Sequence, residues 1–292
     1  MSDITLDCTG PSVSYGEAMR KRMEQNKVLP VIGIYDVFSA ALAAQKFDAI
    51  FCSGYGFAAS YYGLPDEGYI AWTDMVAYVE RIRAVLPETH IVVDIDDGYG
   101  DSNIAANITR RLERIGASAV IIEDQRRPKK CGHLPGKEIL TLDEYMPRLE
   151  AVLSTRGQLY VVARTDISDI EDAIVRAKEF VRAGADGILV EGISDVEQIP
   201  KIRSAVGNKV SVMVNLIAGG KTAPVSLSKL ESLGANLVNY STPCLFAAHH
   251  AIKNYLDNLL ANDGELSDET STVDLSTNNS MLKMMLQNAL GK

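Results

Sequence analysis

Residues 160–192 read YVVARTDISDIEDAIVRAKEFVRAGADGILVEG, and this stretch contains one complete unit of the fold. A short β-branched run (160–166) precedes an amphipathic segment (170–183), and a Gly-Ala pair (184–185) leads into a second apolar run (187–192). Continuous apolar runs of this length are typical of strands buried on both faces of a parallel sheet. Glycine suits the position just beyond a helix. The stretch therefore predicts a strand, a helix and a second, parallel strand.

The same alternation continues along the chain and predicts a closed barrel. The remaining apolar runs occupy residues 29–36, 49–54, 90–96, 119–124, 210–216 and 237–242. Together with the two runs above, they favour a (β/α)8 barrel of the TIM type over residues 1–262. An open, doubly wound sheet is the alternative, but no GxGxxG motif follows the first run, so a dinucleotide-binding fold is disfavoured.

Composition narrows the class of protein. The chain has 292 residues, of which 47% are hydrophobic, and a formal net charge of −9, which argues against binding to nucleic acid. No apolar run reaches the length of a membrane span, and the polar N-terminus lacks a secretory pattern. The four cysteines, Cys8, Cys52, Cys131 and Cys244, form no pair at zinc spacing, so we expect a reduced, cytoplasmic protein.

Residues 263–292 are predicted to lie outside the barrel as a polar linker and a short helix. The stretch 262–280 is acidic and rich in Ser, Thr, Asn and Asp, which is typical of a linker. MLKMMLQNAL (281–290) follows as an amphipathic helix that a monomer would leave exposed. We therefore expect this helix to dock on a partner subunit, with packing in its own chain as the alternative. Membrane contact is disfavoured because its polar face is not basic.

Polar residues follow the apolar runs at their carboxyl ends, where barrel enzymes place catalytic groups. The set comprises Asp36, Ser53, Gly54, Asp94, Asp96, Glu123, Asp124, Arg164, Asp166, Glu191, Asn215 and Ser241. Asp94 and Asp96 are two residues apart, so both should point to one face of a strand. Converging carboxylates repel unless a cation lies between them, and oxygen ligands suit Mg²⁺ or Mn²⁺. The pair predicts a metal site; for Asp94, a cap on the turn before Gly98 is the alternative.

Two further features fit a small anionic ligand. The segment SGYG (53–56) offers backbone amides and a hydroxyl group after the second run, which suits a carboxylate or phosphate. Arg164 ends an apolar run, and its planar guanidinium can bind a carboxylate through two hydrogen bonds. Pairing of Arg164 with Asp166 is the alternative.

The segment AVIIEDQRRPKKCGHLPGK (119–137) continues from a buried strand into a basic loop that contains Gly and Pro. Cys131 lies in this loop among Lys129, Lys130 and His133. Because cations stabilise the thiolate, we expect the pKa of Cys131 to be lowered. A thiol on a loop that follows two acids indicates a lid over an active site; a surface loop that happens to hold a cysteine is the alternative.

These motifs together resemble the isocitrate lyase/phosphoenolpyruvate mutase superfamily. The matching blocks are SGYG, GLPDEG, VDIDDGYGD, IEDQRRPKKCGHLPGK, ARTD, VEG and VNLIAGGKT, in this order from residue 53 to residue 222. The resemblance implies a barrel whose C-terminal helix is swapped between subunits, in a homotetramer built as a dimer of dimers. It also implies Mg²⁺, with Mn²⁺ as the alternative ion, and a small carboxylate or phosphonate substrate.

The resemblance assigns roles residue by residue. It places Asp66, Asp94, Asp96 and Glu123 around the metal ion. It places Ser53, Gly54, Tyr55, Lys130, Gly132, Glu191 and Asn215 in contact with the substrate. Its catalytic set comprises Glu123, Lys129, Cys131, His133 and Arg164, in which Cys131 is the general acid of a closing loop.

The implied reaction is cleavage of a carbon–carbon bond in a 2-hydroxy di- or tricarboxylate similar to methylisocitrate, dimethylmalate or citramalate. The products would be a 2-oxo acid and a second carboxylate. A phosphonomutase or phosphonopyruvate-type hydrolase is an alternative, because carboxyphosphonoenolpyruvate mutases also share the KxCGH pattern. An oxaloacetate hydrolase and a catalytically silent barrel are the remaining alternatives.

The chain departs from the superfamily pattern at three places. Ala218 stands where relatives with NxxEGGKT carry an acid. Pro243 lies near the position at which oxaloacetate hydrolases carry a serine, which argues against that activity. Arg126 and Arg127 add positive charge to the loop. These departures predict a specialised substrate.

Overall fold

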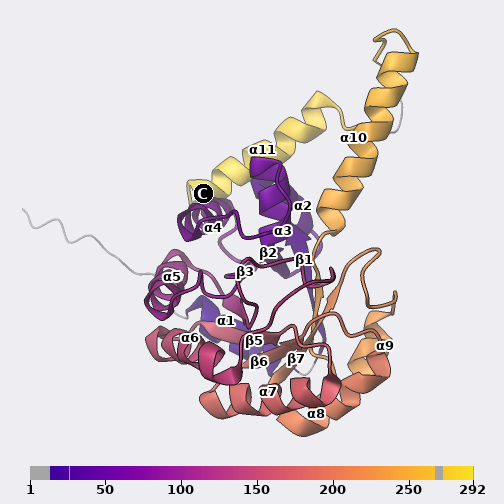
Figure 1. Cartoon of the computed structure of the whole chain (residues 1–292). Coiled ribbons are helices and arrows are strands. Elements are labelled where there is room, and N and C mark those ends of the chain that lie inside the picture. Colours follow the sequence, from indigo (N-terminus) through magenta and orange to yellow (C-terminus); the bar gives the residue numbers. More distant parts are fainter. Residues whose placement is uncertain (1–13, 26, 267–271, 292) are drawn as a thin grey trace, which may run out of the picture.

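The chain forms a closed barrel of eight parallel strands (Figure 1). The computed structural model describes residues 14–25, 27–266 and 272–291. The strands are β1 (Leu29–Ile34), β2 (Ala49–Cys52), β3 (His90–Asp94), β4 (Ala119–Glu123), β5 (Tyr160–Thr165), β6 (Gly187–Val190), β7 (Ser211–Leu216) and β8 (Leu237–Tyr240). Each strand pairs with the next one, and β8 closes on β1 with Leu237 beside Leu29. The predicted (β/α)8 barrel is confirmed.

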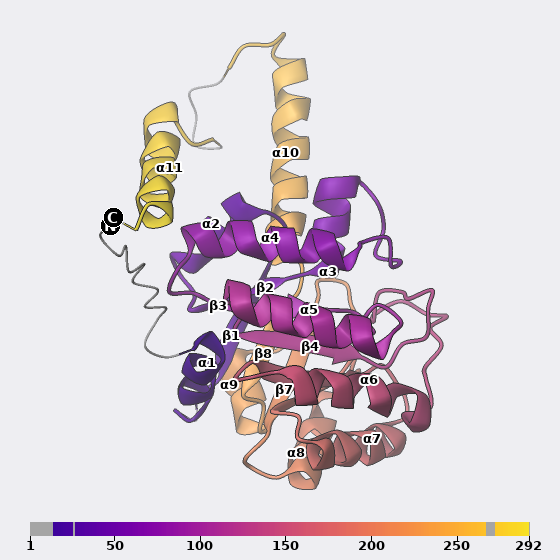
Figure 2. The ribbon, with the colours of Figure 1, turned by 90° about the vertical axis from the view of Figure 1, so that its left-hand side faces the viewer.

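Helices surround this barrel (Figures 1 and 2). They are α1 (Tyr15–Met23), α2 (Val37–Ala44), α4 (Trp72–Val85), α5 (Ser102–Ile115), α6 (Leu142–Thr155), α7 (Ile170–Ala183), α8 (Ile199–Val206) and α9 (Leu227–Ser232). Two short segments follow β2, namely α3 (Gly54–Phe57) and the π-helical turn η1 (Ala58–Tyr62), and a 3-10 turn, η2 (Val196–Gln198), precedes α8.

Helix α7 shows how local sequence sets these boundaries. The carboxylate of Asp169 accepts hydrogen bonds from the backbone N–H groups of Glu171 and Asp172, which caps the first turn. The helix ends at Gly184, whose φ of 104° lies in the left-handed region that glycine adopts without steric cost. The helix predicted at residues 170–183 therefore begins and ends where expected.

Two apolar layers hold the barrel. The inner layer fills the barrel with residues such as Leu29, Phe51 and Met213, and Met19 of α1 packs against it. The outer layer lies between strands and helices and includes Tyr145 and Phe180, which are both fully buried. The barrel interior is therefore filled by side chains, as is usual for this fold. Within the described ranges, no helix is both long and apolar enough to cross a membrane.

The last two helices leave the barrel. Helix α10 (Pro243–Ala261) projects away from it, and α11 (Leu275–Ala289) turns back beside α4 (Figures 1 and 2). Met285 of α11 is buried, and the side chain of Asn288 donates a hydrogen bond to the carbonyl of Val85. In the single chain, α11 therefore packs on its own barrel. This corresponds to the alternative stated for the helix predicted at residues 281–290, namely packing in its own chain.

The boundary predicted between linker and helix is wrong for residues 275–280. Helix α11 begins at Leu275 and not at Met281, because the carboxylate of Asp274 accepts a hydrogen bond from the backbone N–H of Thr277 and caps the helix there. Polar residues of the expected linker therefore form the exposed first turns of the helix. Residues 267–271 of that linker, and Cys8, lie outside the described residues.

Candidate active site

A small cavity lies at the carboxyl ends of the strands, beneath the loop of residues 126–137, which we call the gate loop. Nine of the predicted site residues line it: Ser53, Tyr55, Asp66, Asp94, Cys131, Gly132, Arg164, Glu191 and Asn215. Its free volume is about 30 Å³, which is space for a water molecule but not for a diacid. The gate loop is thus closed, and it must open before a substrate can enter.

Three carboxylates converge beside Gly54. A Cβ atom at this glycine would lie 3.3 Å from Oδ2 of Asp94, 3.6 Å from Oδ1 of Asp96 and 3.8 Å from Oδ1 of Asp66. The convergence agrees with the prediction, but the reason given for it was wrong. Strand β3 ends at Asp94, and Asp96 reaches the cluster because its backbone is left-handed, with a φ of 49°.

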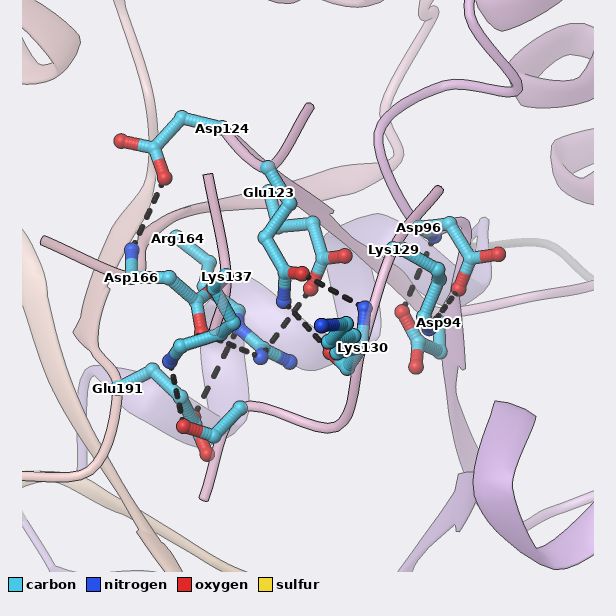
Figure 3. Close-up of polar contacts among 12 residues, drawn as sticks. Asp94, Asp96, Glu123, Asp124, Lys129, Lys130, Lys137, Arg164, Asp166 and Glu191 are labelled. Atoms are coloured by element: carbon cyan, nitrogen blue, oxygen red, sulfur yellow. Dashed lines mark hydrogen bonds and ion pairs between the residues drawn. The ribbon is translucent and has the colours of Figure 1, made fainter. Parts of the chain in front are cut away.

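Lys129 lies inside this acid cluster (Figure 3). Its side chain is 2% exposed, and its Nζ atom lies 3.1 Å from Oδ1 of Asp66 and forms an ion pair with Asp96. Burial alone would lower the pKa of Lys129, but the surrounding carboxylates raise it well above its usual value. Lys129 therefore neutralises part of the cluster and does not point at the thiol.

Glu123 is the acid of the site whose carboxylate oxygens both lack a hydrogen bond from the described residues. It is buried, and Nη2 of Arg164 lies 3.1 Å from Oε2. Burial raises the pKa of Glu123 well above its usual value and raises the pKa of Asp94 to about 6. Burial therefore penalises the charged form of both acids.

This arrangement fits a hard divalent cation. The donors are carboxylate oxygens, and those of Glu123 have no hydrogen-bond partner. As placed, the described side chains form no ready group of three ligands, because the ammonium of Lys129 lies between Asp66 and Asp96. A bound cation would therefore require Lys129 to move aside.

Arg164 is held in place by Asp166. Its Nε and Nη2 atoms donate hydrogen bonds to the two carboxylate oxygens of Asp166, at 2.8 and 3.0 Å (Figure 3). The alternative that Arg164 pairs with Asp166 is therefore correct, but the same guanidinium also lines the cavity. A fixed guanidinium loses little conformational entropy when it binds a carboxylate.

The gate loop brings Cys131 into the cavity but does not activate it. The expected lowering of its pKa is wrong: burial raises the pKa of the Cys131 thiol, and the backbone N–H of His133 offsets this only in part. Lys129 points at the acids, and Lys130 does not line the cavity. Backbone groups of Lys130 exchange hydrogen bonds with the side chain of Gln125 instead.

His133 joins the gate loop to the far side of the cavity. Its Nδ1 atom accepts a hydrogen bond from the backbone N–H of Lys221, so its Nε2 atom carries the proton and lies 2.9 Å from Oε1 of Glu191. Asn215 donates to the same Glu191 oxygen. Burial would raise the pKa of Glu191, but Arg164 and His133 lower it to about 2. Glu191 is therefore a fixed negative charge.

Two residues of the site had no predicted role. Lys137 ends the gate loop, and its Nζ atom donates to the carbonyl of Gly132 and, at 2.7 Å, to Oδ1 of Asp166. Asn239 of β8 donates to Oδ1 of Asn215. The signal for Asn239 was present, because it alternates with Ser241 along an otherwise apolar run. For Lys137 the sequence contained no signal beyond its place in the loop motif.

Comparison with known proteins shows the family to which the chain is related. The profile described as phosphoenolpyruvate phosphomutase matches residues 19–260, which is most of the chain. The chain belongs to this family. The predicted resemblance is confirmed, and so is the prediction of an enzyme of the isocitrate lyase/phosphoenolpyruvate mutase superfamily.

Two relatives and one solved structure illustrate how similar this phosphoenolpyruvate phosphomutase family member is to known proteins. The 2,3-dimethylmalate lyase of Eubacterium barkeri is 31% identical over 242 residues, covering 80% of this chain and 82% of the relative. The 2-methylisocitrate lyase of Shewanella oneidensis is 31% identical over 266 residues, covering 89% and 90%. A solved structure of 2,3-dimethylmalate lyase has a TM-score of 0.86 at 28% identity, covering 96% of this chain and 95% of that one.

Proposed function

We propose that this enzyme is a Mg²⁺-dependent lyase that cleaves a carbon–carbon bond of a 2-hydroxy di- or tricarboxylate. The products are a 2-oxo acid and a second carboxylate. The observation that carries the proposal is the shared cavity, which the partly buried thiol of Cys131, the guanidinium of Arg164 and the carboxylates of Asp66 and Asp94 all line. The lyase names of two relatives support the reaction class.

Asp94, Asp96 and Glu123 would hold the metal ion. Bound Mg²⁺ supplies a positive charge that stabilises the negative charge developing on the substrate's 2-hydroxyl oxygen. Arg164 binds a carboxylate of the substrate and orients it, because its guanidinium is already fixed by Asp166. The amide of Asn215 lines the same cavity and can bind a second oxygen.

Cys131 acts as the general acid. A carboxylate of the acid cluster takes the proton of the 2-hydroxyl. As that oxygen becomes the carbonyl of the 2-oxo acid, the carbon–carbon bond breaks and its electron pair passes to the departing fragment. That carbon then needs a proton. Because burial raises the pKa of the thiol, Cys131 keeps its proton until the fragment takes it. The closed gate loop excludes water from the reacting carbon.

Removal and return of the metal test this reaction. Chelation should abolish release of 2-oxo acid from a panel of 2-hydroxy diacids, and Mg²⁺ should restore it. Asp94→Asn should weaken the affinity for Mg²⁺ by about tenfold or more, measured from the Mg²⁺ dependence of the rate. Asp143→Asn, an exposed acid on α6, is the matched control and should change nothing. Turnover of phosphonopyruvate alone would overturn the lyase proposal in favour of phosphonate chemistry.

We also propose that two copies of the chain exchange α10. No residue of this helix is buried, and Ile252, Leu256 and Leu260 are 58%, 56% and 84% exposed. Beside the base of α10, an apolar groove of about 550 Å³ is lined by residues that include Leu42 of α2 and Leu227 of α9. A helix with exposed leucines from a second copy would cover such a groove and bury both surfaces.

The state of association tests this exchange. Wild-type protein should elute as a dimer or larger assembly in size-exclusion chromatography with light scattering. Leu256→Asp should shift it toward the monomer, because the charge would have to be buried. Val175→Asp is the control, since Val175 is similarly exposed (53%) but lies on α7. A monomeric wild-type protein would rule out the exchange.

A further inference from the structure

Lys137 lies at the base of the gate loop, where the two ends of the loop are joined to each other. The backbone N–H of Arg126 donates a hydrogen bond to the carbonyl of Glu138, so the segments on either side of the loop are paired. Cys131 lies between these ends. Within the described residues, the backbone of the intervening tip, residues 128–136, makes no backbone hydrogen bond to the barrel. Side chains must therefore hold the tip in its closed position.

The ammonium group of Lys137 links this tip to the barrel (Figure 3). Its Nζ atom lies 2.7 Å from Oδ1 of Asp166, which directly follows β5, and it also donates to the carbonyl of Gly132 in the tip. The exposed fractions of the Lys137 and Asp166 side chains are 8% and 0%. Away from water, hydrogen bonds to a charged donor are stronger than at the surface. The carbonyl of Gly132 is therefore firmly held.

The bond from Lys137 acts on the turn that carries the thiol. The carbonyl of Cys131 accepts a hydrogen bond from the backbone N–H of Leu134, so residues 131–134 form a turn. Gly132 and His133 are its central residues. Because the peptide bond is planar, a donor fixed at the carbonyl of Gly132 sets the orientation of the whole peptide that joins them. A rotation of this peptide would move the neighbouring thiol relative to the cavity.

Lys137 exerts this effect from outside the active-site cavity. Gly132 lines that cavity, but Lys137 does not. The charge of Lys137 is paired with Asp166, whose carboxylate also accepts two hydrogen bonds from the guanidinium of Arg164. Asp166 is itself fixed, because its backbone N–H donates to the carboxylate of Asp124. One buried carboxylate is thus shared between the cation that holds the loop tip and the cation proposed to bind the substrate.

We propose that Lys137 is a positioning residue, which receives the carbonyl of Gly132 when the gate loop closes and so places the thiol of Cys131 at the reacting carbon. Because the base of the loop is paired, Lys137 stays beside Asp166 while the tip moves. The shared carboxylate of Asp166 keeps Lys137 aligned with the guanidinium of Arg164, so one group places both the thiol and the bound carboxylate. This inference rests on the proposed lyase function and deepens it by naming the group that places the general acid.

Lys137→Met tests this role, because methionine is unbranched like lysine but has no hydrogen-bond donor. The kcat for a 2-hydroxy diacid should fall by about 10²-fold, which is the cost of a misplaced catalytic group. KM should stay within a few-fold of wild type, because Arg164 keeps its bonds to Asp166. Lys178→Met, at an exposed position on α7, is the matched control and should change neither constant. A raised KM with an unchanged kcat would overturn the proposal, since Lys137 would then bind the substrate.

Alkylation by iodoacetamide separates failure of this inference from failure of the proposed reaction, because it needs no turnover. In Lys137→Met, Cys131 should react several-fold faster than in the wild type, while Cys52, which is buried on β2, stays unmodified. Mass spectrometry of the two peptides reads both thiols in one sample. An unchanged rate at Cys131 would overturn the proposal even if no hydroxy acid is cleaved. Equal acceleration at Cys52 would also overturn it, because Lys137 would then support the fold as a whole.

Discussion

Cys131→Ser should lower kcat by about 10² to 10⁴-fold, the range expected when a general acid is removed. Cys131 lines the active-site cavity, and its raised pKa keeps the thiol protonated. A serine hydroxyl has similar size but is a far weaker acid, so the fragment carbon would not be protonated. The affinity for the 2-oxo acid should stay within a few-fold of wild type, because Arg164 and Asn215 bind it. Stopped-flow kinetics and calorimetry measure the two quantities separately.

Cys244→Ser is the matched control for this experiment. Cys244 is also a partly buried thiol, but it lines the groove beside α10 and not the active-site cavity. Its loss should leave kcat unchanged. Undiminished turnover in Cys131→Ser would remove the thiol from the mechanism, whereas equal losses in both variants would indicate a general effect on folding.

Gly132→Ala should lower kcat/KM by about 10²-fold without unfolding the protein, because a misplaced catalytic group costs about this much. A Cβ atom at residue 132 would lie 2.4 Å from both Nη2 of Arg164 and Cγ of Glu191. Both side chains are buried and held by other partners, so they cannot move away cheaply. The gate loop would then stay open and leave Cys131 outside the closed cavity.

Alkylation of Cys131 by iodoacetamide reports this opening independently of turnover. The thiol should react faster in Gly132→Ala than in the wild type, while the melting temperature stays the same. Leu134→Ala removes an exposed side chain (54%) from the same loop and is the control that should alter neither rate. Slower or unchanged alkylation in Gly132→Ala would contradict the role of Gly132 in closure.

Local signals in the sequence sufficed to predict the barrel and the strand-end residues that line the cavity. Apolar runs, helix caps and the Gly-Ala pairs act within a few residues, so they predict elements such as α7 without knowledge of the rest of the chain. The parallel topology then brings the strand ends together. For this reason Asp94, Arg164 and Glu191, from distant parts of the sequence, line one cavity as expected.

The direction in which Lys129 points and the pKa of Cys131 were set by tertiary packing, so the sequence could not predict them. In the sequence, Lys129 lies two residues before Cys131, but the folded loop turns its side chain into the acid cluster. Buried carboxylates without a cation are energetically costly, whereas a neutral buried thiol is not. The pKa of Cys131 is raised because the closed loop removes it from water. Burial is a property of the whole fold, so no count of neighbouring charges along the chain could predict it.

By itself, the sequence determined a (β/α)8 barrel of the isocitrate lyase/phosphoenolpyruvate mutase superfamily with its acids at the carboxyl ends of the strands. The tertiary structure alone decided that Asp166 and Lys137 hold the closed gate, that α10 leaves the barrel, and that Ala218 and Pro243 line one apolar cavity. The physical reason is the range of the interactions. Strands and caps form between near neighbours in sequence, whereas ion pairs, burial and cavities form between segments that only the closed barrel brings together.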